Sequence, residues 1–234
     1  MIITDPSKRP SERFIEVVQG YFFEKGYLYK KSLNQFTRTI DDRKEMTSIF
    51  YNKTINLVRA TLSWSIFFPQ VEKIYKKIDV ENLQNYTTTL WTDLLNYLPL
   101  RKTGIPRDFD LYNSFDHKYD DFSINNAALE LIKSYETYVE PFFDHYKELQ
   151  ILEKELNRLP LSHHYYIGYG GRQIAIGLIL GKKFQSESFS LLKNAYQEYI
   201  INDKEGEEFK QKMQKYFDSA INFLDQNDID KIIT

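Results

Sequence analysis

The stretch Leu57–Phe67, LVRATLSWSIF, decides the fold class of this protein. Apolar residues stand at every second position through it, and arginine, threonine and serine stand between them. Successive side chains of a β-strand point to opposite faces of a sheet, so this alternation predicts a strand with one buried face. The predicted buried face consists of Val58, Ala60, Leu62, Trp64 and Ile66. The Arg/Thr/Ser row is expected to face water or a partner.

Further strand patterns lie on either side of this stretch. They alternate in the same way, are rich in β-branched and aromatic residues, and are separated by short turns such as Asp41-Asp42. The predicted strands are Leu33–Ile40, Lys44–Tyr51, Asn85–Trp91 and a short one near Phe109–Phe115. Strands joined by turns of a few residues pair antiparallel, so these segments predict a meander.

Two helices are predicted around the first strands. The first is expected to begin at Ser11, whose hydroxyl can accept a hydrogen bond from an unpaired backbone N–H, and to end at Gly26. The second follows the main strand, where apolar residues recur at helical spacing from Phe68 to Ile78.

The second half of the chain is predicted to be helical. A long pattern from Ala128 to Leu149 contains Pro141, where we expect a kink or a break because proline cannot donate its hydrogen bond. After Pro160 the predicted helices are Gln173–Leu180, Ser188–Ile201 and Glu207–Leu224. We therefore predict an α+β fold with an N-terminal helix, an antiparallel meander of four or five strands packed on helices, and an all-helical C-terminal extension. The predicted domains are 1–159 and 160–234, with the second packed on the first.

The order of these elements resembles an uncharacterised bacterial domain family of unknown function. The resemblance covers residues 14–156 and rests on three short motifs: Gly26-Tyr27 after the first helix, TTTLWTDLLNYLP at 87–99, and Pro141-Phe142-Phe143-Asp144 in the long helix. It implies the fold described above and no catalytic residues.

Composition narrows the environment and the function. The sequence contains no cysteine, which excludes disulfides, thiolate metal sites and cysteine nucleophiles. The N-terminus lacks a secretory signal, and no apolar run approaches the roughly 20 residues that span a bilayer, so we expect a cytoplasmic protein and no membrane partner. The net charge is −2, with +5 over residues 1–103 and −7 over residues 104–234. That balance lacks the basic stripe of a nucleic-acid binder, so nucleic acid is not the expected partner.

The aromatic content has two interpretations. The chain has 18 Tyr and 17 Phe against 2 Trp, and tyrosine suits half-buried surfaces because its ring packs while its hydroxyl reaches a partner. The excess predicts either a recognition surface for another protein or a core built on tyrosine and phenylalanine.

The most distinctive local sequence is His163–Arg172, HHYYIGYGGR. Its candidate ligand or partner contacts are His163, His164, Tyr166, Tyr169 and Arg172. Glycines ahead of a helix could present N–H groups to an anion, with Arg172 adding charge, but the spacing matches neither phosphate-loop fingerprint. The alternative is a glycine-rich connector between the predicted domains.

No catalytic or metal-binding pattern is present in the sequence. Adjacent histidines lack metal-ligand spacing, and the acidic segment 108–121 lacks the ligand spacing of a helix–loop–helix calcium site, so no metal and no cofactor are expected. Whether the protein is an enzyme stays open, and the missing motifs favour a non-catalytic role. The leading hypothesis is a protein-interaction protein of the immunity or adaptor type. The alternative is an enzyme or small-ligand protein with a site between the sheet and the long helix, near the His163–Arg172 loop. The oligomeric state is not predicted.

Overall fold

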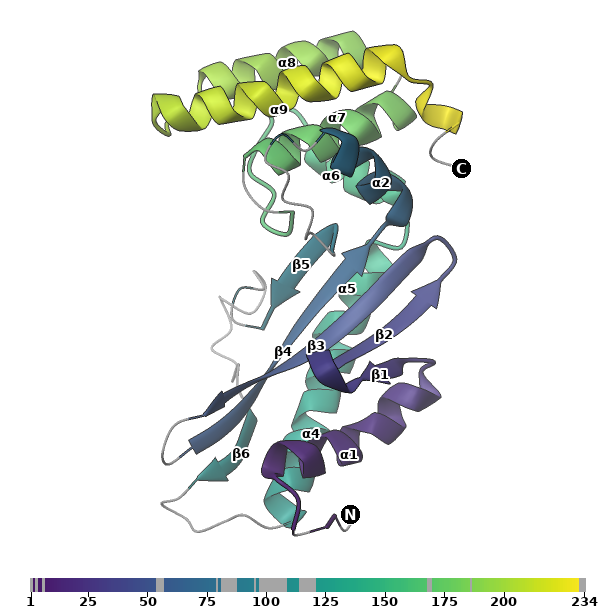
Figure 1. The fold of residues 1–234 in the computed structure, drawn as a ribbon, viewed down its shortest axis with the longest axis vertical. Coiled ribbons are helices and arrows are strands. Elements are labelled where there is room, and N and C mark those ends of the chain that lie inside the picture. Colours follow the sequence, from purple (N-terminus) through teal and green to yellow (C-terminus); the bar gives the residue numbers. More distant parts are fainter. Residues whose placement is uncertain are drawn as a thin grey trace. The chain divides into compact units, whose positions relative to one another are not determined.

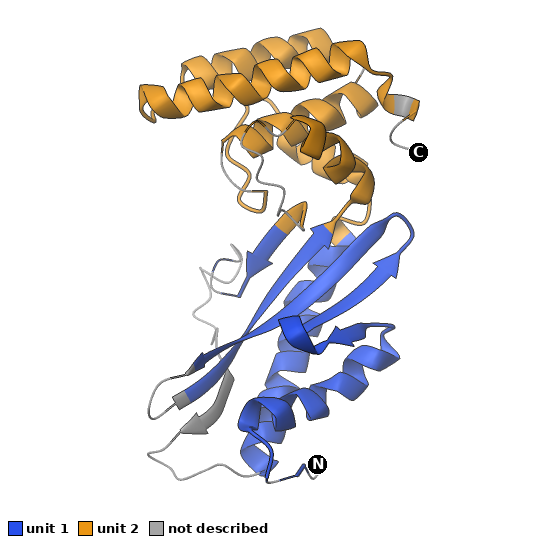
Figure 2. Ribbon diagram, in the orientation of Figure 1, with its two compact units in different colours: residues 1–66, 91–144 blue, residues 67–90, 145–234 orange. Residues whose placement is uncertain are grey.

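The computed structural model describes residues 2, 4–5, 7–53, 57–78, 80, 88–94, 96, 109–113, 121–167, 170–185 and 187–231. The chain forms two compact units (Figure 2). Unit 1 contains residues 1–66 and 91–144, and unit 2 contains residues 67–90 and 145–234. The predicted α+β class is confirmed: an N-terminal helix, an antiparallel sheet and a series of helices follow one another along the chain (Figure 1).

Unit 1 holds the sheet. Its strands are β1 (Leu28–Lys30), β2 (Gln35–Ile40), β3 (Arg43–Lys53), β4 (Leu57–Phe67), β5 (Leu90–Asp93) and β6 (Phe109–Asn113). They are ordered β1-β2-β3-β4-β5, and β6 pairs antiparallel with the first residues of β4. The meander is confirmed, and the strand near residue 109 is confirmed as β6. Residues 85–87 of the strand expected at Asn85–Trp91 lie outside the described residues. Thr88 and Thr89 are not in a strand, and β5 begins at Leu90.

The predicted buried face of β4 is confirmed from residue 60 onward. Ala60, Leu62, Trp64 and Ile66 are all within 1% of complete burial. The expectation that the alternate row faces water is wrong at Ser63 and Ser65, which are 2% and 4% exposed. Period-two alternation assigns residues to two faces, but it does not show how deeply short side chains lie on the second face.

Helix α1 (Pro10–Glu24) begins two residues earlier than a Ser11 cap requires. The N-cap is Arg9, and Glu12 completes a capping box with it. Proline suits the first helical position because its missing N–H would have no partner there, and this explains the earlier start. Gly26 follows the end of the helix at φ +81°, as expected for the glycine that closes a helix.

Aromatic rings join α1 and the long helical segment to one face of the sheet. That segment consists of α4 (Asp121–Ser134), the π-helical turn η2 (Tyr135–Val139) and α5 (Glu140–His145). The ring of Phe22 in α1 stacks on Phe36 in β2 at 4.3 Å, and Trp64 in β4 meets Phe142 in α5 edge-on. The predicted irregularity at Pro141 appears as the π-helical turn just before it, while the helix itself breaks at residues 146–148.

Unit 2 is helical. It contains α2 (Pro69–Ile78), α6 (Leu149–Leu156), α7 (Gly171–Phe184), α8 (Phe189–Ile201), α9 (Glu207–Gln226) and the short η3 (Ile229–Lys231). The three helices predicted after Pro160 are confirmed as α7, α8 and α9. Helix α7 packs against α2, α6, α8 and α9, and eleven of its residues are buried. The boundary predicted after residue 159 falls between α6 and α7, which contact each other within this unit, and separable domains at that point stay a prediction.

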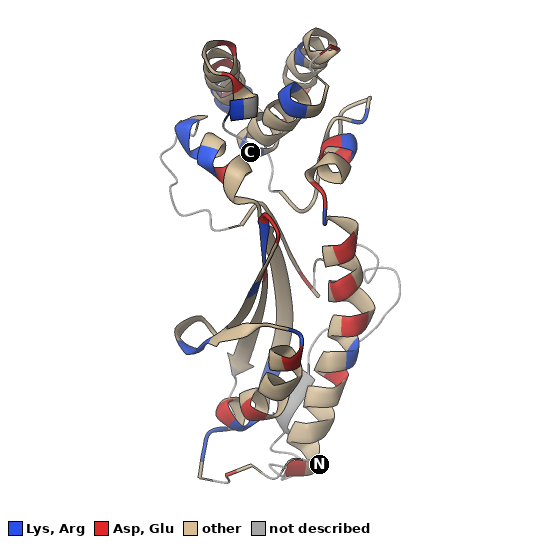
Figure 3. Cartoon of the chain, turned by 90° about the vertical axis from the view of Figure 1, so that its right-hand side faces the viewer, with Lys and Arg blue, Asp and Glu red and all other residues tan. Residues whose placement is uncertain are grey.

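The charges of the described chain are distributed unevenly. Figure 3 shows acidic residues along the segment formed by α4, η2 and α5. Five acidic residues in this segment are at least partly exposed: Asp121, Glu130, Glu136, Glu140 and Asp144. Among the residues that the structure describes, no helix combines the length and the apolar character needed to cross a lipid bilayer.

Candidate functional site

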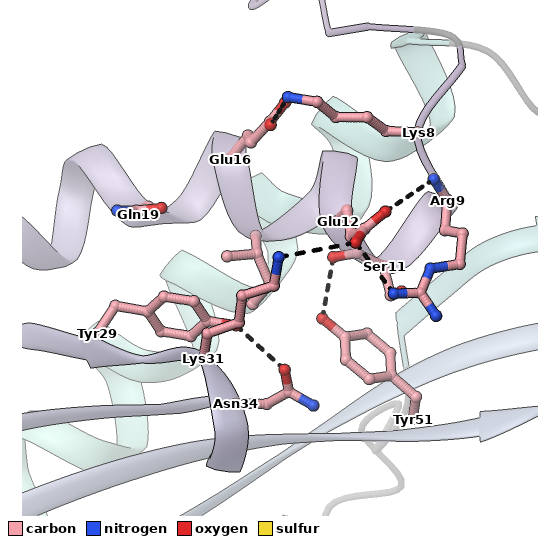
Figure 4. A pocket seen from close by; sticks show the side chains of 11 residues that line it. Lys8, Arg9, Ser11, Glu12, Glu16, Gln19, Tyr29, Lys31, Asn34 and Tyr51 are labelled. Atoms are coloured by element: carbon pink, nitrogen blue, oxygen red, sulfur yellow. Dashed lines mark hydrogen bonds and ion pairs between the residues drawn. The ribbon is translucent and has the colours of Figure 1, made fainter.

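A pocket of about 720 Å³ lies in unit 1. We call it the α1–η1 pocket, because α1 forms one wall and β1 with the 3₁₀ turn η1 (Lys31–Leu33) forms the other (Figure 4). It is lined by Lys8, Arg9, Ser11, Glu12, Ile15, Glu16, Gln19, Tyr29, Lys31, Asn34 and Tyr51. Pockets that hold small ligands or side chains have volumes of about 300–1,000 Å³, so this one can hold a few residues of a peptide.

The charged side chains of the pocket pair with one another. Glu12 accepts from the Arg9 guanidinium at 3.0 Å and lies 3.9 Å from the Lys31 ammonium, which reaches it across the pocket. Lys8 pairs with Glu16. The side chains of Arg9 and Lys31 are 78% and 82% exposed, so these ion pairs are weak and their partners can be exchanged at little cost.

The uncharged polar side chains of the pocket have fewer hydrogen-bond partners among the described residues. The Tyr29 hydroxyl donates to the side-chain oxygen Oδ1 of Asn34 at 3.1 Å, which leaves the side-chain NH₂ of Asn34 unused by the described residues. The side chains of Ser11 and Gln19 likewise have no hydrogen-bond partner among the described residues. These groups supply hydrogen-bonding capacity for a ligand.

Two tyrosine rings give the pocket its apolar surface. Tyr51 of β3 donates to the backbone oxygen of Ser11 at 3.3 Å, and the Tyr29 ring lies against Phe36 at 4.8 Å. Burial raises the pKa of both phenols above the ordinary value, so both hydroxyls stay neutral at physiological pH. The pocket therefore combines neutral aromatic walls with amides, hydroxyls and paired charges, a combination typical of recognition sites.

The sequence-derived candidates lie elsewhere, in unit 2. His163 and His164 are half-buried, and Tyr166 contacts the His164 ring edge-on at 5.6 Å. Burial lowers the pKa of His163, although a hydrogen bond with Gln173 opposes the shift. Tyr169 lies outside the described residues. The proposed anion loop is therefore described only in part and stays untested.

His164 belongs to a cluster of donors around one carboxylate, which we call the Glu155 cluster. Glu155 in α6 accepts from the Tyr146 hydroxyl at 2.7 Å, and its oxygens lie 2.6 Å and 3.4 Å from the Nε2 atoms of His145 and His164. Burial on its own would raise the pKa of Glu155, but the hydrogen bonds from these three donors outweigh it and hold the pKa at about 2. The carboxylate thus stays ionised throughout the physiological pH range.

Arg172 does not face solvent. Its side chain is 6% exposed, and its guanidinium donates to Glu72 and to the backbone oxygen of Thr88, both at 2.7 Å, while lying 4.4 Å from the Tyr75 ring. Burial raises the pKa of Glu72, and Arg172 opposes that shift. Removing one member of such a buried pair leaves the other charge uncompensated, so these contacts hold α7 to α2.

Unit 1 contains a second buried charge network. Glu45 in β3 is completely buried and accepts from Arg38 at 2.7 Å and from two guanidinium nitrogens of Arg43 at 2.9 and 2.6 Å. The Tyr27 hydroxyl lies 3.3 Å from the same carboxylate and 2.8 Å from the Tyr135 hydroxyl. Because the carboxylate is saturated with donors, this network is a structural feature of the core.

Sequence reasoning did not identify the α1–η1 pocket. Its residues come from α1, β1, η1 and β3, and no local motif joins them. The available signal was the pair Arg9 and Glu12 at capping-box spacing, which marks the helix start but not the pocket. In the described residues no group of three histidine, cysteine, aspartate or glutamate side chains is arranged to hold a metal ion.

No protein-family model, curated protein or solved structure matches this chain. The resemblance of residues 14–156 to a bacterial domain family therefore stays an expectation from the sequence. The functional argument depends on the geometry described above.

Proposed function

We propose that this protein is a non-catalytic protein-interaction protein, of the adaptor or immunity type, and that the α1–η1 pocket receives a segment of its partner. The observation that carries the proposal is which polar side chains of the pocket are paired with one another and which are not. Its carboxylates are both held by the pocket's own cations, whereas the NH₂ groups of Gln19 and Asn34 have no acceptor among the described residues. Catalytic sites need an acid or base free to exchange protons, and recognition sites need unpaired polar groups beside apolar walls.

The tyrosine excess of the sequence supports the same proposal. Tyr29 and Tyr51 line the pocket, and aromatic side chains contribute strongly to the binding energy of protein interfaces. A cytoplasmic location belongs to this proposal as well.

The test compares protein capture by three baits. Gln19→Trp fills the pocket with an indole ring without removing a hydrogen bond between described residues, and Gln150→Trp places the same ring on the exposed surface of α6. Proteins retained from a lysate of the source cells are quantified by mass spectrometry, and each candidate is then purified and titrated against the three baits. We expect a partner that binds wild type and Gln150→Trp equally and binds Gln19→Trp at least tenfold more weakly. Equal binding to all three would contradict the proposal.

A second candidate function is an enzyme or small-ligand protein that uses residues near the His163–Arg172 loop. The Glu155 cluster favours it, because a carboxylate bound to an imidazole orients that imidazole as a general base, and His145 is 53% exposed. Under this alternative His145→Ala abolishes turnover or ligand binding while Gln19→Trp has no effect. Under our proposal the pattern is the opposite.

A further inference from the structure

We infer that the α1–η1 pocket takes a carboxylate group from an acidic segment of a partner protein, and that Glu12 is a built-in competitor for this position. The inference rests on the proposed function and adds the chemistry of the ligand. It follows from the balance of donors and acceptors, from the position of Glu12, and from the charge of the pocket.

Donors outnumber acceptors in the pocket. The lining contains three cations, Lys8, Arg9 and Lys31, against two carboxylates. Among the described residues the NH₂ group of Asn34 has no acceptor and the Gln19 amide has no partner, so the two side chains add two NH₂ donor groups and one acceptor oxygen. A ligand rich in acceptors satisfies this set better than a cationic one, and a carboxylate is an acceptor-only group that can take up to four hydrogen bonds.

Glu12 shows where such a carboxylate would be bound. Its oxygens accept from the Arg9 backbone N–H at 3.3 Å and from the Arg9 guanidinium at 3.0 Å, and the Lys31 ammonium lies 3.9 Å away. The two side-chain contacts involve Arg9 and Lys31, which are more than three-quarters exposed, and the Lys31 contact is longer than a hydrogen bond (Figure 4). A ligand carboxylate can therefore replace Glu12 at Lys31 without breaking any buried interaction.

The walls of the pocket fit the rest of an acidic side chain. The rings of Tyr29 and Tyr51 and the side chain of Ile15 provide apolar surface for methylene groups, while the cations lie closer to solvent.

The experiment measures fluorescence anisotropy of a labelled hexaglutamate peptide, with a hexaglutamine peptide as the uncharged reference, at about 50 mM salt, where screening is moderate. We expect hexaglutamate to bind wild type at least fivefold more tightly than hexaglutamine. Lys31→Glu should weaken hexaglutamate binding at least fivefold, and Lys31→Arg should leave it within twofold. Lys44→Glu makes the same charge change at an exposed position of β3 outside the pocket and should have less than a twofold effect.

Glu12→Gln is the most specific variant. Glutamine keeps the capping box, so α1 still begins at the same residue, but the competing charge is removed. Since an exposed ion pair is worth little, we expect hexaglutamate to bind about two- to fivefold more tightly. Equal binding of the two peptides, no gain in Glu12→Gln, or a loss in Lys44→Glu as large as in Lys31→Glu would each overturn the inference.

The outcomes separate this inference from the proposed function. If Gln19→Trp abolishes binding of the purified partner while the peptide results fail, the pocket recognises a partner that is not acidic. If Gln19→Trp leaves partner binding unchanged, the proposed function is wrong regardless of the peptide results.

Discussion

Replacing Gly177 by alanine should destabilise unit 2, although alanine is the better helix former. Gly177 lies within α7, and a Cβ atom added there would be 1.8 Å from the Tyr196 hydroxyl oxygen and 2.7 Å from the ring carbon that carries it. Tyr196 cannot move away easily, because it is completely buried and donates to Asn157 at 2.8 Å. Asn157 in turn donates to the Gly177 carbonyl at 3.0 Å. Hydrogen bonds therefore link Tyr196 to Asn157 and Asn157 to Gly177, and an added Cβ atom would disturb both.

The magnitude follows from opposing effects. Alanine gains about 1 kcal/mol over glycine in a helix interior. Overpacking a buried site costs about 1–3 kcal/mol. Displacing the Tyr196 hydroxyl leaves Asn157 unsatisfied, which costs another 1–3 kcal/mol or so. The net expectation is a loss of about 1–5 kcal/mol in the free energy of unfolding, measured by urea denaturation.

Two further variants test whether the contact with Tyr196 causes the expected loss of stability. Gly20 lies in α1, where an added Cβ has no atom within 4 Å, so Gly20→Ala should instead stabilise by roughly 0.5–1 kcal/mol. Tyr196→Phe removes the atom closest to the new Cβ, so Gly177→Ala should cost less in that background than in wild type. If Gly177→Ala is neutral or stabilising, or costs the same in both backgrounds, the close packing of α7 on Tyr196 is not what limits this position.

Other predictions concern both units. Leu62→Ala should cost about 2–5 kcal/mol, because this fully buried side chain leaves a cavity under β4, whereas Leu129→Ala, at a 62% exposed position, should change stability by less than about 0.5 kcal/mol in the same denaturation assay. The folded-state pKa of Glu155 is depressed to about 2 from a usual 4.5, so its contribution is present above pH 4.5 and is lost as the pH falls toward 2. Melting temperatures of Glu155→Gln should therefore fall less over that interval than those of wild type, and parallel curves would refute the pKa assignment. Melting should be the same with and without a chelator, since binding of a metal to the native state alone would raise stability; a fall of several degrees would reveal a metal site. Ending the chain after Pro160 removes α7, which packs on α6, so residues 1–160 should melt lower or aggregate, and an unchanged melting temperature would mean that the extension is an independent module.

The sequence predicted the elements whose pattern is long and regular. β4 has eleven residues, the central nine of which alternate strictly, and its bounds were predicted correctly. β1 was missed because three residues, Leu28–Lys30, are too few to show a period, and they become a strand only by pairing with β2. The start of α1 was misplaced because Ser11 has the stronger intrinsic cap preference, while Pro10 decides the position.

The candidate site was predictable only in part, because burial and long-range pairing leave little trace in one sequence. His164 was singled out from its neighbours in the chain, yet its carboxylate partner Glu155 lies in α6 and could not be assigned to it. Arg172 looked like an exposed cation, but it pairs with Glu72, which is 100 residues away. Both partners could be recognised only after the helices of unit 2 had been assembled.

The discontinuous course of the chain has a consequence during synthesis. The polypeptide passes from one unit to the other after residues 66, 90 and 144, so α2 leaves the ribosome about a hundred residues before α7. At a synthesis rate of roughly 5–20 residues per second, the apolar face of α2 waits on the order of ten seconds for its packing partner. That face contains Val71, Ile74, Tyr75 and Ile78. During this interval these side chains stay exposed to the surrounding solution, because an isolated helix of this length is only marginally stable in water without its packing partner.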